Sequence, residues 1–190
     1  MTLEVVKYGH PALRQKGALI EKITPEIKKL IADMFETMRA SHGIGLAAQQ
    51  VGLALQLTVI DVREADKERP STIELKGKPA DVGEIMPLVL INPQIKPLGE
   101  SVEGGEGCLS FPQIYGDISR PELVDVKALD EKGKVIEFRA GGLLSRAIQH
   151  EVDHLNGILF IDRMSRKTKE ELRAELDELQ AATKAELQKK

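Results

Sequence analysis

Apolar residues recur at helical spacing in three segments of the chain, and these segments predict its helices. The first is 24–41, where Thr24 suits the N-cap and Pro25 suits the first helical position. The second runs from Leu143 to Leu155. The third, 166–189, is highly charged but carries an apolar stripe, which is typical of an amphipathic helix lying against the body of a protein. The stripe consists of Leu172, Leu176, Leu179, Thr183 and Leu187.

Strand-forming stretches lie between the first two helices. Gln56 to Val62 and Leu88 to Asn92 are predicted strands. Pro93 is expected to stop the second strand, because proline has no backbone N–H to donate to a sheet. Two further runs, Leu123 to Leu129 and Lys134 to Phe138, predict a hairpin around the turn sequence between them.

The segment 63–86 is charged and is interrupted by Pro70, Gly77, Pro79 and Gly83. It is expected to be a surface loop or insertion, and a mobile one. The pattern as a whole predicts an α+β fold, with short and mostly antiparallel strands around a central helix. The 190 residues fit one domain. Residues 1–165 would form its body, and 166–190 would be a C-terminal helical extension of the same domain.

Composition and charge narrow the classes of function. The chain has 27 basic and 30 acidic residues, so no basic excess exists to bind phosphates and direct DNA binding is not expected. Aromatic residues make up only 3%, which argues against a base-stacking surface. The single cysteine allows no internal disulfide and fits a reducing compartment. With no leader pattern and no long apolar run, we expect a soluble cytoplasmic protein without a membrane segment.

The strongest chemical signal is the segment Gln149-His150-Glu151-Val152-Asp153-His154. On a helix, His150 and His154 lie one turn apart on the same face, where one metal ion can bind both imidazoles. Glu151 directly follows the first histidine, and in this pattern the carboxylate moves protons to and from a water molecule at the metal. The segment therefore predicts a metal-dependent hydrolase.

A third metal ligand is needed, and Cys108 is the best candidate. Residues 155–161 contain neither His nor Glu, so the ligand spacings of the common metalloproteases do not apply. Cys108 is the only thiol and lies in a glycine-rich stretch, which predicts a turn that projects its side chain. Two histidines, one cysteine and an open position would make a catalytic site, since structural sites close with four protein ligands.

Three rival interpretations remain open at this point. A metallo-endopeptidase would use the same histidines and Glu151 to cleave internal peptide bonds. A cysteine hydrolase would use Cys108 as the nucleophile and a histidine as the base. A structural or metal-sensing site on an interaction module would need no catalysis, and its function would survive the loss of Glu151.

A third segment, Gly43-Ile44-Gly45-Leu46-Ala47-Ala48-Gln49-Gln50, is rich in small residues. It is not a phosphate-binding loop, because it lacks the Lys-Ser/Thr pair and the required spacing. Small residues instead allow another backbone to approach closely. The side-chain amide of Gln50 is a candidate donor to an oxyanion that develops during a reaction.

Together, the segments 43–50 and 149–154 and the motif Glu106-Gly107-Cys108-Leu109-Ser110 resemble the peptide deformylase family. Their order and separation match, and the resemblance extends over roughly residues 3–165. It implies a hydrolase that removes the formyl group from the N-terminal formylmethionine of newly made bacterial polypeptides, releasing formate. On this resemblance Cys108, His150 and His154 bind the metal, and Glu151 acts as general base and then as general acid. Gln50 and the backbone N–H of Leu109 stabilise the oxyanion.

The resemblance also implies how the substrate binds. Gly45 and Gly107 would lie beside the peptide backbone, which adds to the enzyme like a strand. Ile44, Leu143 and His150 would line an apolar pocket for the methionine side chain.

Cofactor and partners follow from the same resemblance. One divalent metal is expected per chain, typically Fe²⁺, although Zn²⁺, Ni²⁺ and Co²⁺ also suit the ligands. The substrates would be nascent polypeptides in the bacterial cytoplasm, and the helix 166–189 is a candidate ribosome contact.

The chain departs from the family pattern in two places. Tyr115 stands where many relatives carry an arginine thought to meet the peptide, whereas the nearby Arg120 matches a recurrent arginine and is a candidate partner for Asp153. The segment 63–86 is longer than in compact bacterial forms, so it is expected to mark a subclass or to form a lid.

Overall fold

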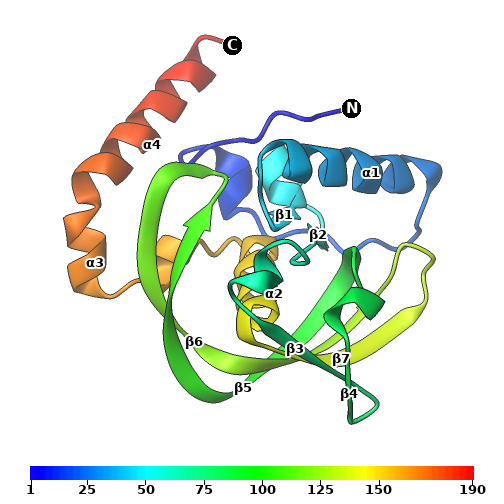
Figure 1. The fold of residues 1–190 in the computed structure, drawn as a ribbon. Helices are drawn as coiled ribbons and strands as arrows, with labels where there is room; N and C mark the ends of the chain where they lie inside the picture. The colour runs from blue at the N-terminus through cyan, green and yellow to red at the C-terminus, as the bar shows by residue number, and fades with distance from the viewer.

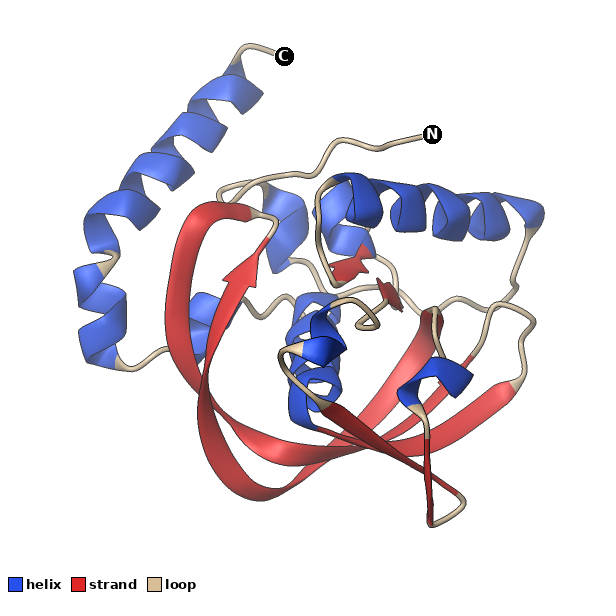
Figure 2. Ribbon diagram, viewed as in Figure 1, coloured by secondary structure: helices blue, strands red, loops and turns tan.

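The computed structural model describes all residues from Met1 to Lys190. Its strands form one seven-stranded sheet in the order β1-β2-β5-β6-β7-β3-β4, and every neighbouring pair is antiparallel. The sheet curves around helix α2, and α1 and the C-terminal helices lie outside it (Figures 1 and 2). The predicted α+β class, with a central helix and a C-terminal helical region, is confirmed.

The elements have the following bounds. The strands are β1 (Gly45–Ala47), β2 (Leu57–Ile60), β3 (Ser71–Leu75), β4 (Lys78–Ala80), β5 (Leu88–Cys108), β6 (Phe111–Leu129) and β7 (Val135–Gly141). The helices are α1 (Pro25–Ala40), α2 (Gly142–Leu155), α3 (Arg166–Glu171) and α4 (Arg173–Gln188). Short 3-10 turns connect them, and one of these, Ala48–Val51, carries site residues.

Helix α1 forms as its sequence predicts. The Thr24 hydroxyl accepts a hydrogen bond from the backbone N–H of Ile27 at 3.3 Å, which satisfies one of the free N–H groups of the first turn. Pro25 occupies the first helical position, where no N–H is needed. The predicted range 24–41 differs from the helix only by its two capping residues.

Strand β5 is four times longer than the prediction, and the expected stop at Pro93 is wrong. The pairing of β5 with β6 shifts register between Ile91 and Gln94, so Pro93 lies in a bulge where no ladder bond is required. Asn92 takes a positive φ of 51° at this bulge. The resulting β5–β6 hairpin runs to its tip at Cys108, so the strands of this sheet are not all short.

The segment 63–86 is not the irregular loop that its charge predicted. It contains β3 and β4, which turn back on each other at Lys76-Gly77, where φ is 51° and 75°. Two consecutive positive φ values are typical of a tight hairpin turn. Strand β3 pairs with β7 and buries Ile73, so this segment extends the sheet.

The predicted hairpin of 123–129 and 134–138 is confirmed as the paired ends of β6 and β7. The C-terminal region is also helical, but it is two helices that meet at Leu172 and not one. Its apolar stripe faces the body of the protein, where Leu176 packs beside Leu13, Phe111 and Phe160. No helix is both long enough and apolar enough to span a membrane.

Helix α2 lies at the centre of the fold (Figure 1). Leu144, Ile148 and Val152 pack against the apolar face of the sheet, together with Leu90 and Val124. All but two of its residues are buried. A helix enclosed to this extent holds its polar side chains in fixed positions. The buried polar residues of α2 are therefore candidate functional residues.

Candidate metal centre

Cys108, His150 and His154 come together in the structure. Their potential ligand atoms all lie within 4.8 Å of one another, and the Cys108 Sγ is 3.4 Å from the His154 Nε2. The two histidines lie one turn apart on α2, as their spacing predicted. Cys108 is the last residue of β5, beside the turn Leu109-Ser110, so the predicted projecting turn is the tip of a long hairpin.

The residues present suit a divalent metal. One thiol and two imidazoles match the preferences of Zn²⁺, Fe²⁺, Ni²⁺ and Co²⁺. Histidine binds a metal as the neutral ring, and burial lowers the pKa of His154 well below its ordinary value. The His150 Nδ1 is 2.9 Å from a Glu106 carboxylate oxygen, so a proton on Nδ1 leaves the Nε2 lone pair free for a metal.

Glu106 is the functional residue that sequence reasoning did not assign. Its carboxylate accepts from Arg120 at 2.5 and 2.9 Å and from Arg146 at 2.9 Å, besides its contact with His150. Burial by itself would raise the pKa of Glu106, but the hydrogen bonds from His150 and Arg120 outweigh it and lower the pKa to about 2. A sequence signal existed: Glu106 and Cys108 are two apart in a strand and therefore share a face.

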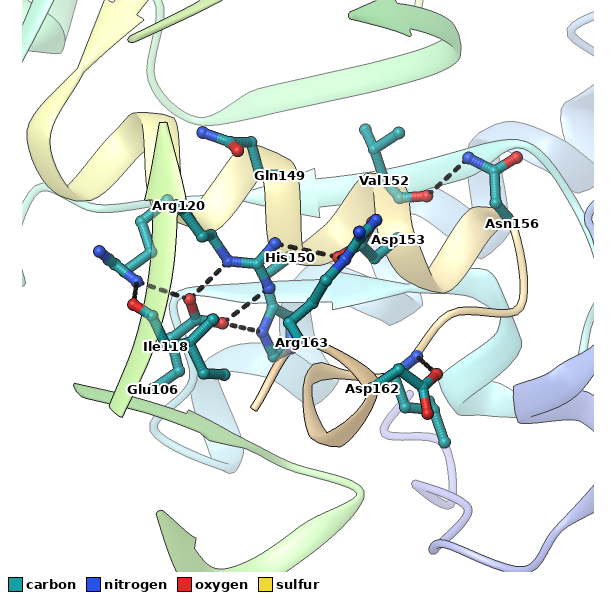
Figure 3. Close-up of polar contacts among 12 residues, drawn as sticks. Glu106, Ile118, Arg120, Gln149, His150, Val152, Asp153, Asn156, Asp162 and Arg163 are labelled. Carbon is teal, nitrogen blue, oxygen red and sulfur yellow. Dashed lines mark hydrogen bonds and ion pairs between the residues drawn. The ribbon is translucent and has the colours of Figure 1, made fainter. Parts of the chain in front are cut away.

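The charged network continues to Asp153 (Figure 3). Arg120 donates to Asp153 at 2.9 Å, as the sequence suggested, and Arg163 donates to the same carboxylate at 2.9 and 3.2 Å. Arg120 and Glu106 are buried, so each charge depends on its partner to offset the loss of hydration. The network therefore holds the His150 ring in one orientation.

Glu151 points into the same site from the next position on α2. It is buried, and its Oε2 has no hydrogen-bond partner. Burial raises the pKa of Glu151 to about 7, which suits a group that both accepts and donates a proton near neutrality. Gly45 lies against it, because a Cβ at that position would be 2.6 Å from the Glu151 Oε1. A side chain at position 45 would displace this carboxylate.

Gln50 also borders the metal site. Its Oε1 accepts from the backbone N–H of Ala47 at 2.9 Å, which orients the amide. Its Nε2 is 3.5 Å from the Cys108 Sγ and 3.3 Å from the Ser110 Oγ. The amide nitrogen therefore lies next to Cys108 and the Ser110 hydroxyl, at the edge of the candidate metal site, where it could donate to an oxyanion.

A pocket of about 630 Å³ opens over the metal site. All of the residues predicted to bind substrate line it: Ile44, Gly45, Gly107 and Leu143, together with Leu109 and Gln50. Tyr115 lies at its mouth with 70% of its surface exposed. A Cβ at Gly107 would be 2.7 Å from two atoms along one edge of the Tyr115 ring, so only a glycine allows the ring to come this close to the strand.

Comparison with known proteins identifies this arrangement. The profile described as polypeptide deformylase matches residues 2–170. The chain belongs to the polypeptide deformylase family. The peptide deformylase of Opitutus terrae is 45% identical over 189 residues, which cover 97% of this chain and 96% of the relative. That of Methylacidiphilum infernorum is 48% identical, with 94% and 93% covered.

Solved deformylase structures share the fold. The Synechococcus elongatus enzyme in complex with actinonin is 41% identical, with a TM-score of 0.74 over 93% of this chain and 85% of that one. The Legionella pneumophila enzyme is 35% identical, with a TM-score of 0.78 over 96% and 97%. The interpretation of this chain as a metallohydrolase of the deformylase family, which removes N-formyl groups from polypeptides, is confirmed.

Within this deformylase, Glu106→Gln should weaken metal retention. The amide cannot provide both the acceptor for His150 and the charge that pairs with Arg120, so the ring loses its fixed orientation. We expect metal to dissociate about 10- to 100-fold faster, measured by transfer to a chromophoric chelator. Glu103→Gln, an exposed change on the same strand, is the matched control. Equal dissociation rates in wild type and Glu106→Gln would show that Glu106 does not support the metal site.

Proposed function

We propose that this chain removes the formyl group from the N-terminal formylmethionine of newly made polypeptides, using one divalent metal held by Cys108, His150 and His154. One observation carries the proposal: a thiol and two imidazoles meet beneath an open pocket, beside a buried carboxylate with an unpaired oxygen. A closed structural site would explain neither the open pocket nor the buried, unpaired oxygen of Glu151.

We infer that the native metal is Fe²⁺, with Zn²⁺, Ni²⁺ and Co²⁺ as substitutes that the same ligands accept. When bound, the metal supplies Lewis-acid chemistry: it polarises a carbonyl group and lowers the pKa of a water molecule. A thiolate ligand also makes the site sensitive to oxidation at Cys108. Any test of the native metal should therefore use protein that has been purified without exposure to oxygen.

Glu151 is the proton carrier in this proposal. Its carboxylate takes a proton from the attacking water and later gives it to the amine that leaves, and a pKa near 7 suits both steps. The Gln50 amide and the Leu109 backbone N–H donate to the oxygen of the formyl carbonyl as it gains negative charge. Support for this role of Gln50 comes from its orientation by Ala47.

The peptide is proposed to bind as an added strand. Gly45 and Gly107 both line the pocket and carry no side chain to keep a substrate backbone away. Ile44 and Leu143 provide apolar surface beside them, which suits a methionine side chain. The formyl group then lies next to the metal ligands at the floor of the pocket.

The direct test is anaerobic purification followed by metal analysis and a formate-release assay on a formylmethionyl tripeptide. We expect about one iron per chain and release of formate in step with appearance of the free amine. An internal peptide bond should remain intact, which separates deformylation from endopeptidase action. Stoichiometric zinc with full activity would refute the proposed metal, and cleavage within the tripeptide would refute the proposed reaction.

We further propose that residues 1–165 carry the catalytic function in the bacterial cytoplasm, and that 166–190 is an extension of the same domain that contacts the ribosome. Leu176 and Thr183 anchor the extension to the body, and its outward face stays exposed. Five exposed lysines of this face could meet ribosomal RNA: Lys167, Lys169, Lys184, Lys189 and Lys190.

Charge reversal tests this contact without removing the buried leucine. The triple variant Lys167→Glu, Lys169→Glu, Lys184→Glu should cosediment with ribosomes at least about tenfold less at moderate salt, because each lost phosphate contact weakens binding. Formate release from a short peptide should not change. A triple variant at Glu170, Glu175 and Glu178, each changed to Gln, is the control. Unchanged cosedimentation of the lysine variant would exclude the proposed contact.

A further inference from the structure

The open part of the substrate pocket carries an excess of positive charge. Lys7, Arg69 and Arg146 line it, whereas its only carboxylates, Glu106 and Glu151, are buried. The chain as a whole has a net charge of −3, so this excess is local. A passing peptide would therefore meet cations at the walls of the pocket before it meets any carboxylate.

Two of these cations are already engaged. Arg146 donates to Glu106 at 2.9 Å and to the backbone carbonyls of Ile118 and Val102, both at 2.8 Å. Lys7 donates to the Leu109 carbonyl at 3.2 Å. Arg69 is different: its residue is exposed, and its guanidinium forms no ion pair or hydrogen bond in the structure. Its charge is free to act on a ligand.

The backbone around Arg69 is nevertheless held in place. The Pro70 carbonyl accepts from the Leu143 N–H at 3.2 Å, and the Ser71 hydroxyl accepts from the Leu144 N–H at 2.9 Å. These bonds attach the segment 63–86 to the first turn of α2. The backbone next to Arg69 is thereby attached to the first turn of α2, whose Leu143 lines the part of the pocket that we propose for the methionine side chain.

We propose that Arg69 is a specificity-determining residue that reads the charge of the third residue of the formylmethionyl peptide, favouring Asp or Glu over Lys or Arg. This inference rests on the proposed function. In an extended peptide, successive side chains point to opposite sides, so the first and third share a side and the second does not. A methionine directed toward Leu143 places the third side chain on the side of Arg69.

The expected effect is modest because the contact is exposed to solvent. Pairs of this kind contribute little and are screened by salt. Attraction of one peptide and repulsion of another act in opposite directions, so the ratio of their rates is the sensitive quantity. We expect kcat/KM for formyl-Met-Ala-Glu to exceed that for formyl-Met-Ala-Lys by about fivefold at low ionic strength. The ratio should approach one as the salt concentration rises.

Three variants test the assignment with formyl-Met-Ala-X peptides in which X is Glu, Gln or Lys, each amidated at the C-terminus. Arg69→Gln should bring the Glu-to-Lys ratio near one, Arg69→Lys should keep most of it, and Arg69→Glu should reverse it. Lys67→Gln is the matched control, since Lys67 is exposed on the same segment but does not line the pocket. Peptides of the form formyl-Met-X-Ala test the neighbouring position.

The outcomes separate this inference from the proposed function. If the wild-type protein releases no formate from the Gln peptide, the proposed function is refuted, and the proposed role of Arg69 in substrate selection is refuted with it. If formate is released but Arg69→Glu leaves the Glu-to-Lys ratio unchanged, the role of Arg69 is overturned. An equal change in Lys67→Gln, or an effect confined to the second residue, would overturn it as well.

Discussion

Glu151→Ala should abolish turnover and leave the metal in place. Glu151 is not one of the three residues that we propose to hold the metal, and its Oε2 has no hydrogen-bond partner, so its loss should leave the metal site intact. Proton transfer by a positioned group contributes about 10²- to 10⁴-fold to a rate, and we expect kcat to fall by at least that range. Metal content by elemental analysis and formate release by a coupled assay are the two measurements.

Two controls sharpen this test. Glu151→Gln preserves the shape of the side chain, so a similar loss of kcat would assign the effect to the lost proton carrier and not to a cavity beside Gly45. Glu171→Ala, an exposed glutamate at the end of α3, should behave as wild type. If Glu151→Ala retained both its metal and its function, a structural or metal-sensing role would replace the catalytic one.

Removal of the metal should inactivate the protein reversibly. Lewis-acid stabilisation of a developing charge contributes several kcal/mol, so stripping with a strong chelator should lower formate release by more than about 10²-fold. Adding Fe²⁺ under anaerobic conditions, or Ni²⁺, should restore it. The measurement is activity against metal content during titration, which should rise in proportion up to one metal per chain.

The same experiment separates the metal mechanism from a cysteine nucleophile. An enzyme that used the Cys108 thiol for covalent attack would keep its activity after chelation and lose it on alkylation. In the metal mechanism, bound metal occupies the Cys108 Sγ and should slow alkylation of the loaded protein relative to the stripped protein. Full activity of metal-free protein would exclude the proposed mechanism.

Local features of the chain were predictable because short-range physics decides them. The cap at Thr24 and the proline after it set the start of α1, and four-residue spacing placed His150 and His154 on one face of α2. The hairpin of β6 and β7 follows from alternation around a turn. Each of these depends on residues only a few positions apart.

Features that depend on distant partners were predicted poorly. Pro93 ends a strand by local rules, yet pairing with β6 accommodates it at a bulge. The charged segment 63–86 forms β3 and β4 because β7 offers an edge on which β3 can pair. The local composition of 63–86 does not show that β7 has a free edge, so the sequence predicted a loop for this polar segment.

The features of the candidate site also fall into those that the sequence predicted and those that depend on the tertiary structure. The sequence by itself predicted the ligand set, since Cys108 is the only thiol and the two histidines share one helix face, and it determined the family through three motifs. Only the tertiary structure decided that Glu106 orients His150 and that Arg69 reaches the pocket. Glu106 and His150 are 44 positions apart in the chain, and Arg69 lines the pocket together with residues of β5 and α2 that are far from it in sequence. Long-range packing creates these relations, and no spacing rule of a helix or strand extends that far.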